Sequence, residues 1–134
     1  MKNTFFLSLL ICFFFCFASP YKTFGNDSNS ALFQKALSES REGNFIDALD
    51  SWNHLIALFP DDAIALSNRG NVLLALGDKE GAINDQTRAI ELLPLEIDPH
   101  LNRGIAEEAL CRWQDAEKDY QWILDRKPNE SSVL

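Results

Sequence analysis

Apolar residues recur at helical spacing in paired segments along residues 29–130. The middle pair is the clearest, because the helical pattern of Ala63 to Leu76 is interrupted at Gly77 and resumes from Lys79 to Leu92. Glycine suits the left-handed backbone that ends a helix, and the proline that follows, Pro94, cannot continue one. The pattern therefore predicts a helical hairpin.

The hairpin pattern repeats with a period of 34 residues, in three copies at 29–62, 63–96 and 97–130. Residues that coincide at this offset include Ala48, Ala82 and Ala116, then Pro60, Pro94 and Pro128, and also Gly70 and Gly104. The outer copies predict helices near Ser30–Glu42, Phe45–Leu58, Asp98–Leu110 and Trp113–Arg126, with Ser30 capping the first. Because repeated hairpins bury their apolar faces against their neighbours, the sequence predicts an all-α solenoid of three stacked hairpins.

Small residues have a separate role inside each hairpin. Gly70 in the first helix and Ala82 in the second leave room for the two helix axes to approach closely. Trp52 is expected in the core, and His54 is expected to be structural and partly exposed, because it lacks a second residue at metal-ligand spacing.

The period, the mid-helix glycines, and the repeated alanines and prolines resemble the tetratricopeptide repeat over Asn29 to Glu130. The sequence also departs from that pattern at several places. Leu32, Leu66 and His100 stand where the family often has tryptophan, Arg69 and Arg103 where it has leucine, and Cys111 where Gly43 and Gly77 end the other first helices. A narrower resemblance, to plastid tetratricopeptide proteins of plants, is carried by the segment from Asn68 to Pro94.

In such an array the first helices line a concave groove. The positions expected there are Phe33, Gln34, Leu37 and Arg41, then Ser67, Asn68, Asn71 and Leu74, then Leu101, Asn102, Ile105 and Glu108. Asn68 and Asn102 could each offer a donor and an acceptor to a peptide backbone, or could bond within the array. Arg69 and Arg103 are expected to pack their stems between helices and to show their guanidinium groups at the surface.

The family's clamp for the acidic tail of heat-shock chaperones needs basic residues at set places in the groove. The clamp also has an asparagine in its middle repeat, which Asn68 would match, but its other places hold Phe33, Leu37, Asp98 and Asn102. Because an aspartate repels the carboxylates that the clamp must attract, the sequence predicts no binding of such a tail.

The first 19 residues differ from the rest of the chain. A basic Lys2 precedes an apolar run, Phe5 to Ala18, which is shorter than a comfortable membrane span and resembles a secretory signal. Three alternatives stay open: a cleaved signal, a retained membrane anchor formed by residues 5–18, and a non-targeting origin on a plastid or thylakoid protein. Residues 20–28 are polar and turn-prone, and they predict a linker.

The net charge of −8 argues against a nucleic-acid partner and leaves two interpretations, a solvated acidic surface or a preference for basic partner segments. Six carboxylates are expected mostly on outward faces: Asp47, Asp50, Asp85, Asp115, Glu117 and Asp119. Cys111 is expected at a helix-ending position, in left-handed backbone. We find no acid–base pair, nucleophile with a base, metal-ligand cluster or phosphate loop, so the sequence predicts no enzyme, metal or cofactor.

The C-terminal residues 131–134 fall in the register of a further first helix and resemble its stub. The last predicted helix should therefore leave apolar surface open at Tyr120, Ile123 and Leu124, which favours self-association or a chain shortened relative to its relatives. The sequence as a whole predicts a non-catalytic module that binds a peptide or helix, and one role open to it is assembly of a membrane or organellar complex. The alternative is a truncated or structural product without a competent groove.

Overall fold

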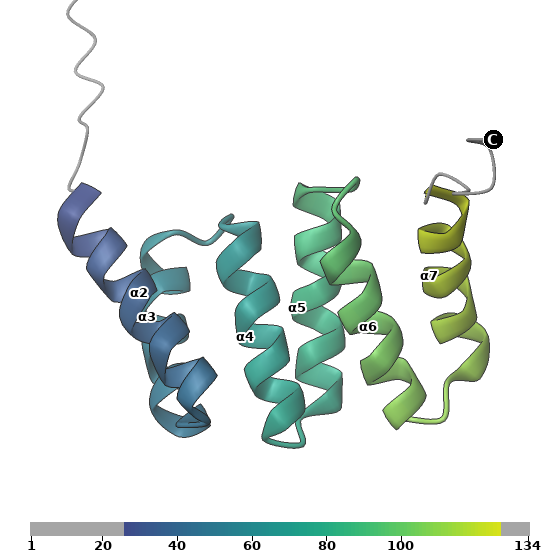
Figure 1. Cartoon of the computed structure of the whole chain (residues 1–134), viewed down its shortest axis with the longest axis horizontal. Helices are drawn as coiled ribbons and strands as arrows, with labels where there is room; N and C mark the ends of the chain where they lie inside the picture. Colours follow the sequence, from purple (N-terminus) through teal and green to yellow (C-terminus); the bar gives the residue numbers. More distant parts are fainter. Residues whose placement is uncertain (1–25, 127–134) are drawn as a thin grey trace, which may run out of the picture.

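The computed structural model describes residues 26–126, with side chains from residue 29 onward. This part of the chain is helical throughout and has no strand; its elements are α2 (Asn26–Glu42), α3 (Phe45–Leu58), α4 (Ala63–Ala75), α5 (Lys79–Leu92), α6 (Ile97–Ala109) and α7 (Trp113–Arg126). The helices pack as three hairpins in a row, with α2 and α7 at opposite ends (Figure 1). The all-α prediction is confirmed for these residues, whereas the segment 1–19 and the stub 131–134 lie outside the described part.

One boundary prediction was wrong. Helix α2 begins at Asn26, so it includes the last three residues of the segment predicted as a linker, and Ser30 lies inside the helix and does not cap it. Asparagine, aspartate and serine suit a turn and a first helical turn about equally well, which explains the error.

Aspartates cap the start of α4 and α5, and positive-φ residues follow α2, α4 and α6. The side chain of Asp62 accepts hydrogen bonds from the backbone N–H groups of Ile64 and Ala65, each at 3.0 Å, at the start of α4. Gly77 lies just after α4 with a φ of 91°, and Cys111 has a φ of 60° at the equivalent place in the third hairpin. The predicted left-handed backbone at Cys111 is therefore confirmed.

In the second and third hairpins, a glycine of the first helix packs against a large side chain of the second helix. A Cβ atom placed on Gly70 would lie 2.8 Å from the side-chain nitrogen of Gln86 and 3.3 Å from the backbone oxygen of Ala82. A Cβ on Gly104 would lie 2.6 Å from the ring of Tyr120. Trp52, as predicted, is fully buried in the first hairpin. The close approach inferred from the small residues is confirmed.

The array curves with its first helices on the inner side. Helix α4 contacts both α2 and α6, whereas among the described residues α5 contacts neither α3 nor α7. Since the inner helices of a curved stack lie closer together than the outer ones, α2, α4 and α6 line the concave face.

The last helix leaves part of its outer face open. Trp113 and Leu124 on α7 are 61% and 62% exposed, but Ile123 is only 7% exposed. The prediction of an open apolar surface thus holds for Leu124 and was wrong for Ile123, which turns into the third hairpin. Within residues 26–126, no helix combines the length and apolar character needed to span a bilayer.

Candidate functional site

Two cavities lie along the inner face, one on each side of α4. The cavity between α4 and α6 has a volume of about 440 Å³ and is lined by Ala63, Ile64, Ser67, Asn68, Asn71, Leu93, Glu96, Asp98, Pro99 and Asn102. The cavity between α2 and α4 has a volume of about 300 Å³ and is lined by Leu37, Ser40, Arg41, Phe45, Asn68, Asn71 and Val72. Because Asn68 and Asn71 line both, we call the two cavities together the groove.

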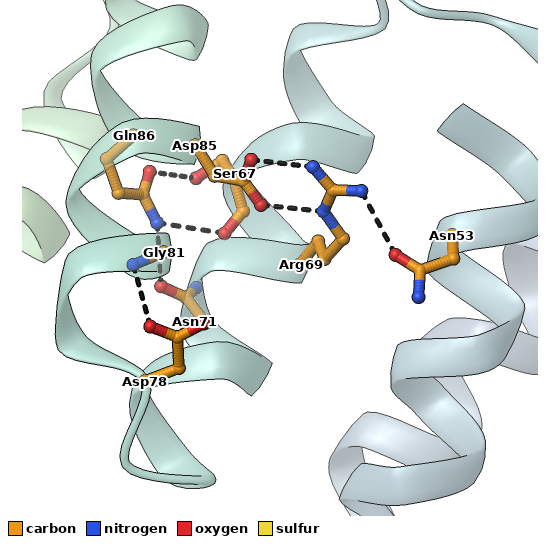
Figure 2. Close-up of polar contacts among 8 residues, drawn as sticks. All are labelled: Asn53, Ser67, Arg69, Asn71, Asp78, Gly81, Asp85 and Gln86. Carbon is orange, nitrogen blue, oxygen red and sulfur yellow. Dashed lines mark hydrogen bonds and ion pairs between the residues drawn. The ribbon is translucent and has the colours of Figure 1, made fainter. Parts of the chain in front are cut away.

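A buried glutamine holds the groove side of α4 in place. Gln86 of α5 is 1% exposed. Its amide oxygen accepts a hydrogen bond from the Ser67 hydroxyl at 2.8 Å, and its amide nitrogen donates to Asn71 Oδ1 at 3.0 Å and to the backbone oxygen of Ser67 at 2.9 Å (Figure 2). These bonds orient Asn71 so that its own NH₂ group is left for a ligand.

The two asparagines expected to contact a peptide are not equivalent. Asn68 donates one amide hydrogen to the backbone oxygen of Ile64 at 2.9 Å, which fixes its side chain along α4 and leaves its carbonyl oxygen as an acceptor. Asn102 forms no side-chain hydrogen bond with any residue in the described range. The groove thus has one pre-oriented amide and one adaptable amide one period apart.

The structure brings six of the twelve predicted groove residues to the cavities just described, namely Leu37, Arg41, Ser67, Asn68, Asn71 and Asn102. Gln34 joins Leu37 and Arg41 at a further hollow on α2. Leu101 and Ile105 lie exposed on α6, and Leu74 is half-buried on α4.

Two of the predicted groove residues contact the second helix of their own hairpin. Phe33 packs edge-on against Trp52 in the core, with the ring centroids 5.2 Å apart and the rings at 85°. Glu108 turns toward α7, where it accepts a hydrogen bond from the Tyr120 hydroxyl at 2.8 Å. Burial of the ring, and secondarily that bond, raises the pKa of Tyr120 to about 12. In both cases the partner lies on the second helix, which the spacing of the first helix does not reveal.

Arg69 and Arg103, which were expected to show their guanidinium groups at the surface, have side chains that are 23% and 22% exposed and use those groups in ion pairs. The Arg69 guanidinium forms a two-pronged ion pair with Asp85, with both N···O distances 2.7 Å, and donates to Asn53 of the preceding hairpin at 3.0 Å (Figure 2). Arg103 repeats this arrangement with Asp119 and with Thr87. The hydrogen bonds to the aspartates raise the pKa of both arginines.

The two aspartates are therefore buried and do not face solvent. Asp85 is 7% exposed and Asp119 is 3% exposed. A buried carboxylate is tolerated when it is paired and hydrogen-bonded, as both are here. The sequence did carry a signal for these pairs, since an arginine precedes an aspartate by 16 residues twice, one period apart. We call these the arginine clips, Arg69 with Asp85 and Arg103 with Asp119.

The third hairpin adds a histidine to its arginine clip. His100 Nδ1 lies 2.8 Å from Asp119 Oδ1, and the imidazole ring stacks on Trp122 with a centroid distance of 3.7 Å. Nearby Glu107 is 8% exposed, and its Oε2 has no hydrogen-bond partner among the described residues. Burial, and secondarily the charge of Asp119, raises the pKa of Glu107.

The sequence prediction considered only the middle of the first helices and therefore missed several residues that line the groove. Leu93 and Glu96 belong to the α5–α6 connection, and Ile64 and Pro99 to first helical turns, yet all four line the cavity between α4 and α6. Since first helices lie next to one another on the inner side, the turn that starts one helix borders the groove of the previous one.

Comparison with known proteins agrees with the architecture and the period. Residues 33–97 match the family model of the tetratricopeptide repeat. This part of the chain carries the tetratricopeptide repeat. Two curated relatives are a FAM10 family protein of Arabidopsis thaliana, 35% identical over 102 residues (75% of this chain, 23% of the relative), and sperm-associated antigen 1A of Danio rerio, 36% identical over 92 residues (63% of this chain, 22% of the relative). The chain thus spans less than a quarter of these relatives.

Among solved structures, the first tetratricopeptide repeat domain of Spaghetti (RPAP3), bound to the HSP90 peptide SRMEEVD, matches with a TM-score of 0.73 and 24% identity. The match covers 79% of this chain and 84% of that one. At this identity the likeness concerns the fold of the tetratricopeptide repeat array. The narrower resemblance to plastid proteins stays a prediction.

Proposed function

We propose that this chain is a non-catalytic protein-interaction module that holds an extended segment of a partner protein in the groove. The supporting observation is that amide side chains from two first helices, Asn68, Asn71 and Asn102, border one cavity. An extended peptide carries unpaired N–H and C=O groups, and amide side chains can satisfy both kinds. A groove that offers both at intervals suits a peptide backbone better than a compact small molecule.

The lining also contains apolar surface for the side chains of such a segment. Ile64 and Leu93 border the same cavity and are 57% and 42% exposed. Peptide sites typically combine a few oriented polar groups with apolar walls of this kind.

We further propose that the partner is not the acidic tail of a heat-shock chaperone, although the first repeat domain of Spaghetti (RPAP3), a structural neighbour, is bound to an HSP90 peptide. The cavity between α4 and α6 has two carboxylates, Glu96 and Asp98, and no lysine, arginine or histidine in its lining. Carboxylates of the tail would be repelled there. Fluorescence anisotropy with labelled SRMEEVD peptide should show no saturable binding, and an affinity in the micromolar range would refute this part of the proposal.

The groove itself is tested by capture of partners from a cell extract with three forms of the protein: the parent, Asn68→Ala/Asn102→Ala, and the control Asn84→Ala/Gln114→Ala. The control removes two exposed amides from the second helices α5 and α7, away from the groove. Partners retained by parent and control should be lost from the groove variant. A partner held equally by all three forms would reject the groove as its binding site.

The alternative function, a truncated or structural product without a competent groove, predicts a different thermal unfolding curve. A module with a competent groove should melt in a sharp, cooperative transition, whereas a product too short to hold a partner should lose its helix gradually.

A role in assembling a membrane or organellar complex would require residues 1–19 to direct the protein to that complex. Tracking a C-terminally tagged form and sequencing its N-terminus would show whether that segment is retained.

A further inference from the structure

The two cavities of the groove differ in charge. Glu96 and Asp98 border the cavity between α4 and α6, both are exposed, and neither forms an ion pair with another residue in the range 29–126. Arg41 borders the other cavity, between α2 and α4. The remaining arginines of the first helices, Arg69 and Arg103, are held in the arginine clips.

Glu96 and Asp62 occupy equivalent places in successive repeats, but their carboxylates form different contacts. Asp62 is the N-cap residue of α4, and its carboxylate accepts two backbone N–H groups of that helix. Glu96 is the N-cap residue of α6, but its side chain accepts no hydrogen bond from the helix. The carboxylate of Glu96 therefore remains available at the cavity, and Asp98 in the first turn of α6 adds a second charge.

The rest of the lining suits a long side chain with a cationic end. Ile64, Leu93 and Pro99 supply apolar wall, while Asn68 and Asn102 supply polar groups beside it. Lysine and arginine lay their aliphatic stems along apolar surface and keep the charged group at a polar one. An acidic or purely apolar side chain would leave the two carboxylates either repelled or unpaired.

We propose that the cavity between α4 and α6 binds a lysine or arginine side chain of an extended partner peptide. Glu96 and Asp98 pair with the cation, Ile64 and Leu93 contact its aliphatic stem, and Asn68, Asn71 and Asn102 hold the adjoining peptide backbone. This inference rests on the proposed function, because it specifies what the groove selects. It also orders the charges of the bound peptide along the groove. A basic residue lies toward α6, and an acidic residue of the same peptide would be favoured near Arg41.

The test is an NMR titration of the ¹⁵N-labelled full chain with acetyl-Ala-Arg-Ala-amide, following the side-chain amide signals of Asn68, Asn71 and Asn102. The matched probe replaces arginine by citrulline, which has nearly the same shape but no charge. The arginine peptide should shift these signals, and raising the salt concentration should weaken its binding. The citrulline peptide should bind at least about tenfold more weakly.

Two double variants separate the site from a general effect of charge. Glu96→Gln/Asp98→Asn should lower the affinity for the arginine peptide about tenfold or more. The control Asp47→Asn/Asp50→Asn removes two exposed carboxylates from α3 and should bind like the parent. Circular dichroism of both variants checks that the helices are intact.

Each other outcome has a distinct meaning. Equal binding of the arginine and citrulline peptides, with shifts at the three asparagines, would overturn the cation site and leave the groove proposal standing. Equal loss in both double variants would overturn the assignment to Glu96 and Asp98. If neither peptide shifts the asparagine signals at millimolar concentration, both the cation site and the proposed groove fail.

Discussion

In the middle hairpin Asp85 pairs with Arg69 alone, whereas in the third hairpin Asp119 pairs with Arg103 and also contacts His100. The position of His100 is occupied in the middle hairpin by Leu66, an apolar residue that is 4% exposed. The arginine clip is thus common to the second and third hairpins, and the side chain beside it is apolar in one and polar in the other. A carboxylate oxygen has two lone pairs, so Asp119 Oδ1 can accept from Arg103 and also lie 2.8 Å from His100 Nδ1.

The same two hairpins differ at two further positions. Leu73 of the middle hairpin corresponds to the buried Glu107 of the third, and Gly77 corresponds to Cys111. Both differences place a less suitable residue in the third hairpin, an acid in a buried site and a side chain in left-handed backbone. The third hairpin should therefore be the less stable of the two, and substitutions can measure each contribution.

The largest expected effect comes from removing the aspartates of the arginine clips. Asp85→Ala and Asp119→Ala should each lower the free energy of unfolding by about 3 kcal/mol, because the arginine is left near the interior without its partner. The loss should be greater for Asp119→Ala, which also strips His100 of its contact. Urea denaturation measures both, with the exposed Asp50→Ala as a control expected to change stability by less than about 0.5 kcal/mol. If the three variants behave alike, the arginine clips contribute nothing to stability.

An intermediate effect is expected where the first helices end. Cys111→Gly should raise the free energy of unfolding by about 1 kcal/mol, because glycine adopts a φ of 60° without the strain of a side chain. Gly77→Ala should lower it by about the same amount, since a Cβ at Gly77 would meet no atom within 4 Å and only the backbone preference changes. Thermal denaturation measures both variants, and Cys111→Ala, which removes the thiol but keeps a side chain, is the control. A gain in Cys111→Ala as large as in Cys111→Gly would point to the thiol and away from the backbone.

The smallest expected effect concerns pH. Burial raises the pKa of Glu107 in the folded chain, so the folded state favours the protonated acid. Its contribution is most favourable below the ordinary pKa of glutamate and is lost as the pH rises through the raised value in the folded state. Glu107→Gln should therefore be more stable than the parent at neutral pH, with the difference shrinking in acid. Urea titrations at acidic and neutral pH measure this, and a difference that grows in acid would contradict it.

Prediction from sequence succeeded where the cause is local or periodic. Gly77 marks a helix end through its own backbone preference, and Gly70 marks a close approach through its lack of a side chain. It failed where the cause lies on another helix. Phe33 was assigned to the groove because its position on α2 permits it, but its contact with Trp52 depends on packing across the hairpin.

The arginine clips and the acidic residue Glu96 were also missed because their positions depend on other helices. Asp85 was expected in solvent because a carboxylate alone belongs there, and only its pairing with Arg69 makes burial favourable. Glu96 was missed because it lies in a connection, although stacking of α6 beside α4 brings it to the cavity. Comparing charged residues between repeats, and not only small and apolar ones, would have revealed the first of these.

Each arginine clip reaches back to the hairpin before it, Arg69 to Asn53 and Arg103 to Thr87. At each of the two junctions between hairpins, an arginine of the later hairpin therefore donates a hydrogen bond to a side-chain oxygen of the earlier hairpin. If residues 63–96 were duplicated in place, Thr87 of the first copy would face the arginine of the second, and the second copy's threonine would face Arg103. The junctions are interchangeable, so the array could be lengthened by gene duplication or by design without inventing a new interface.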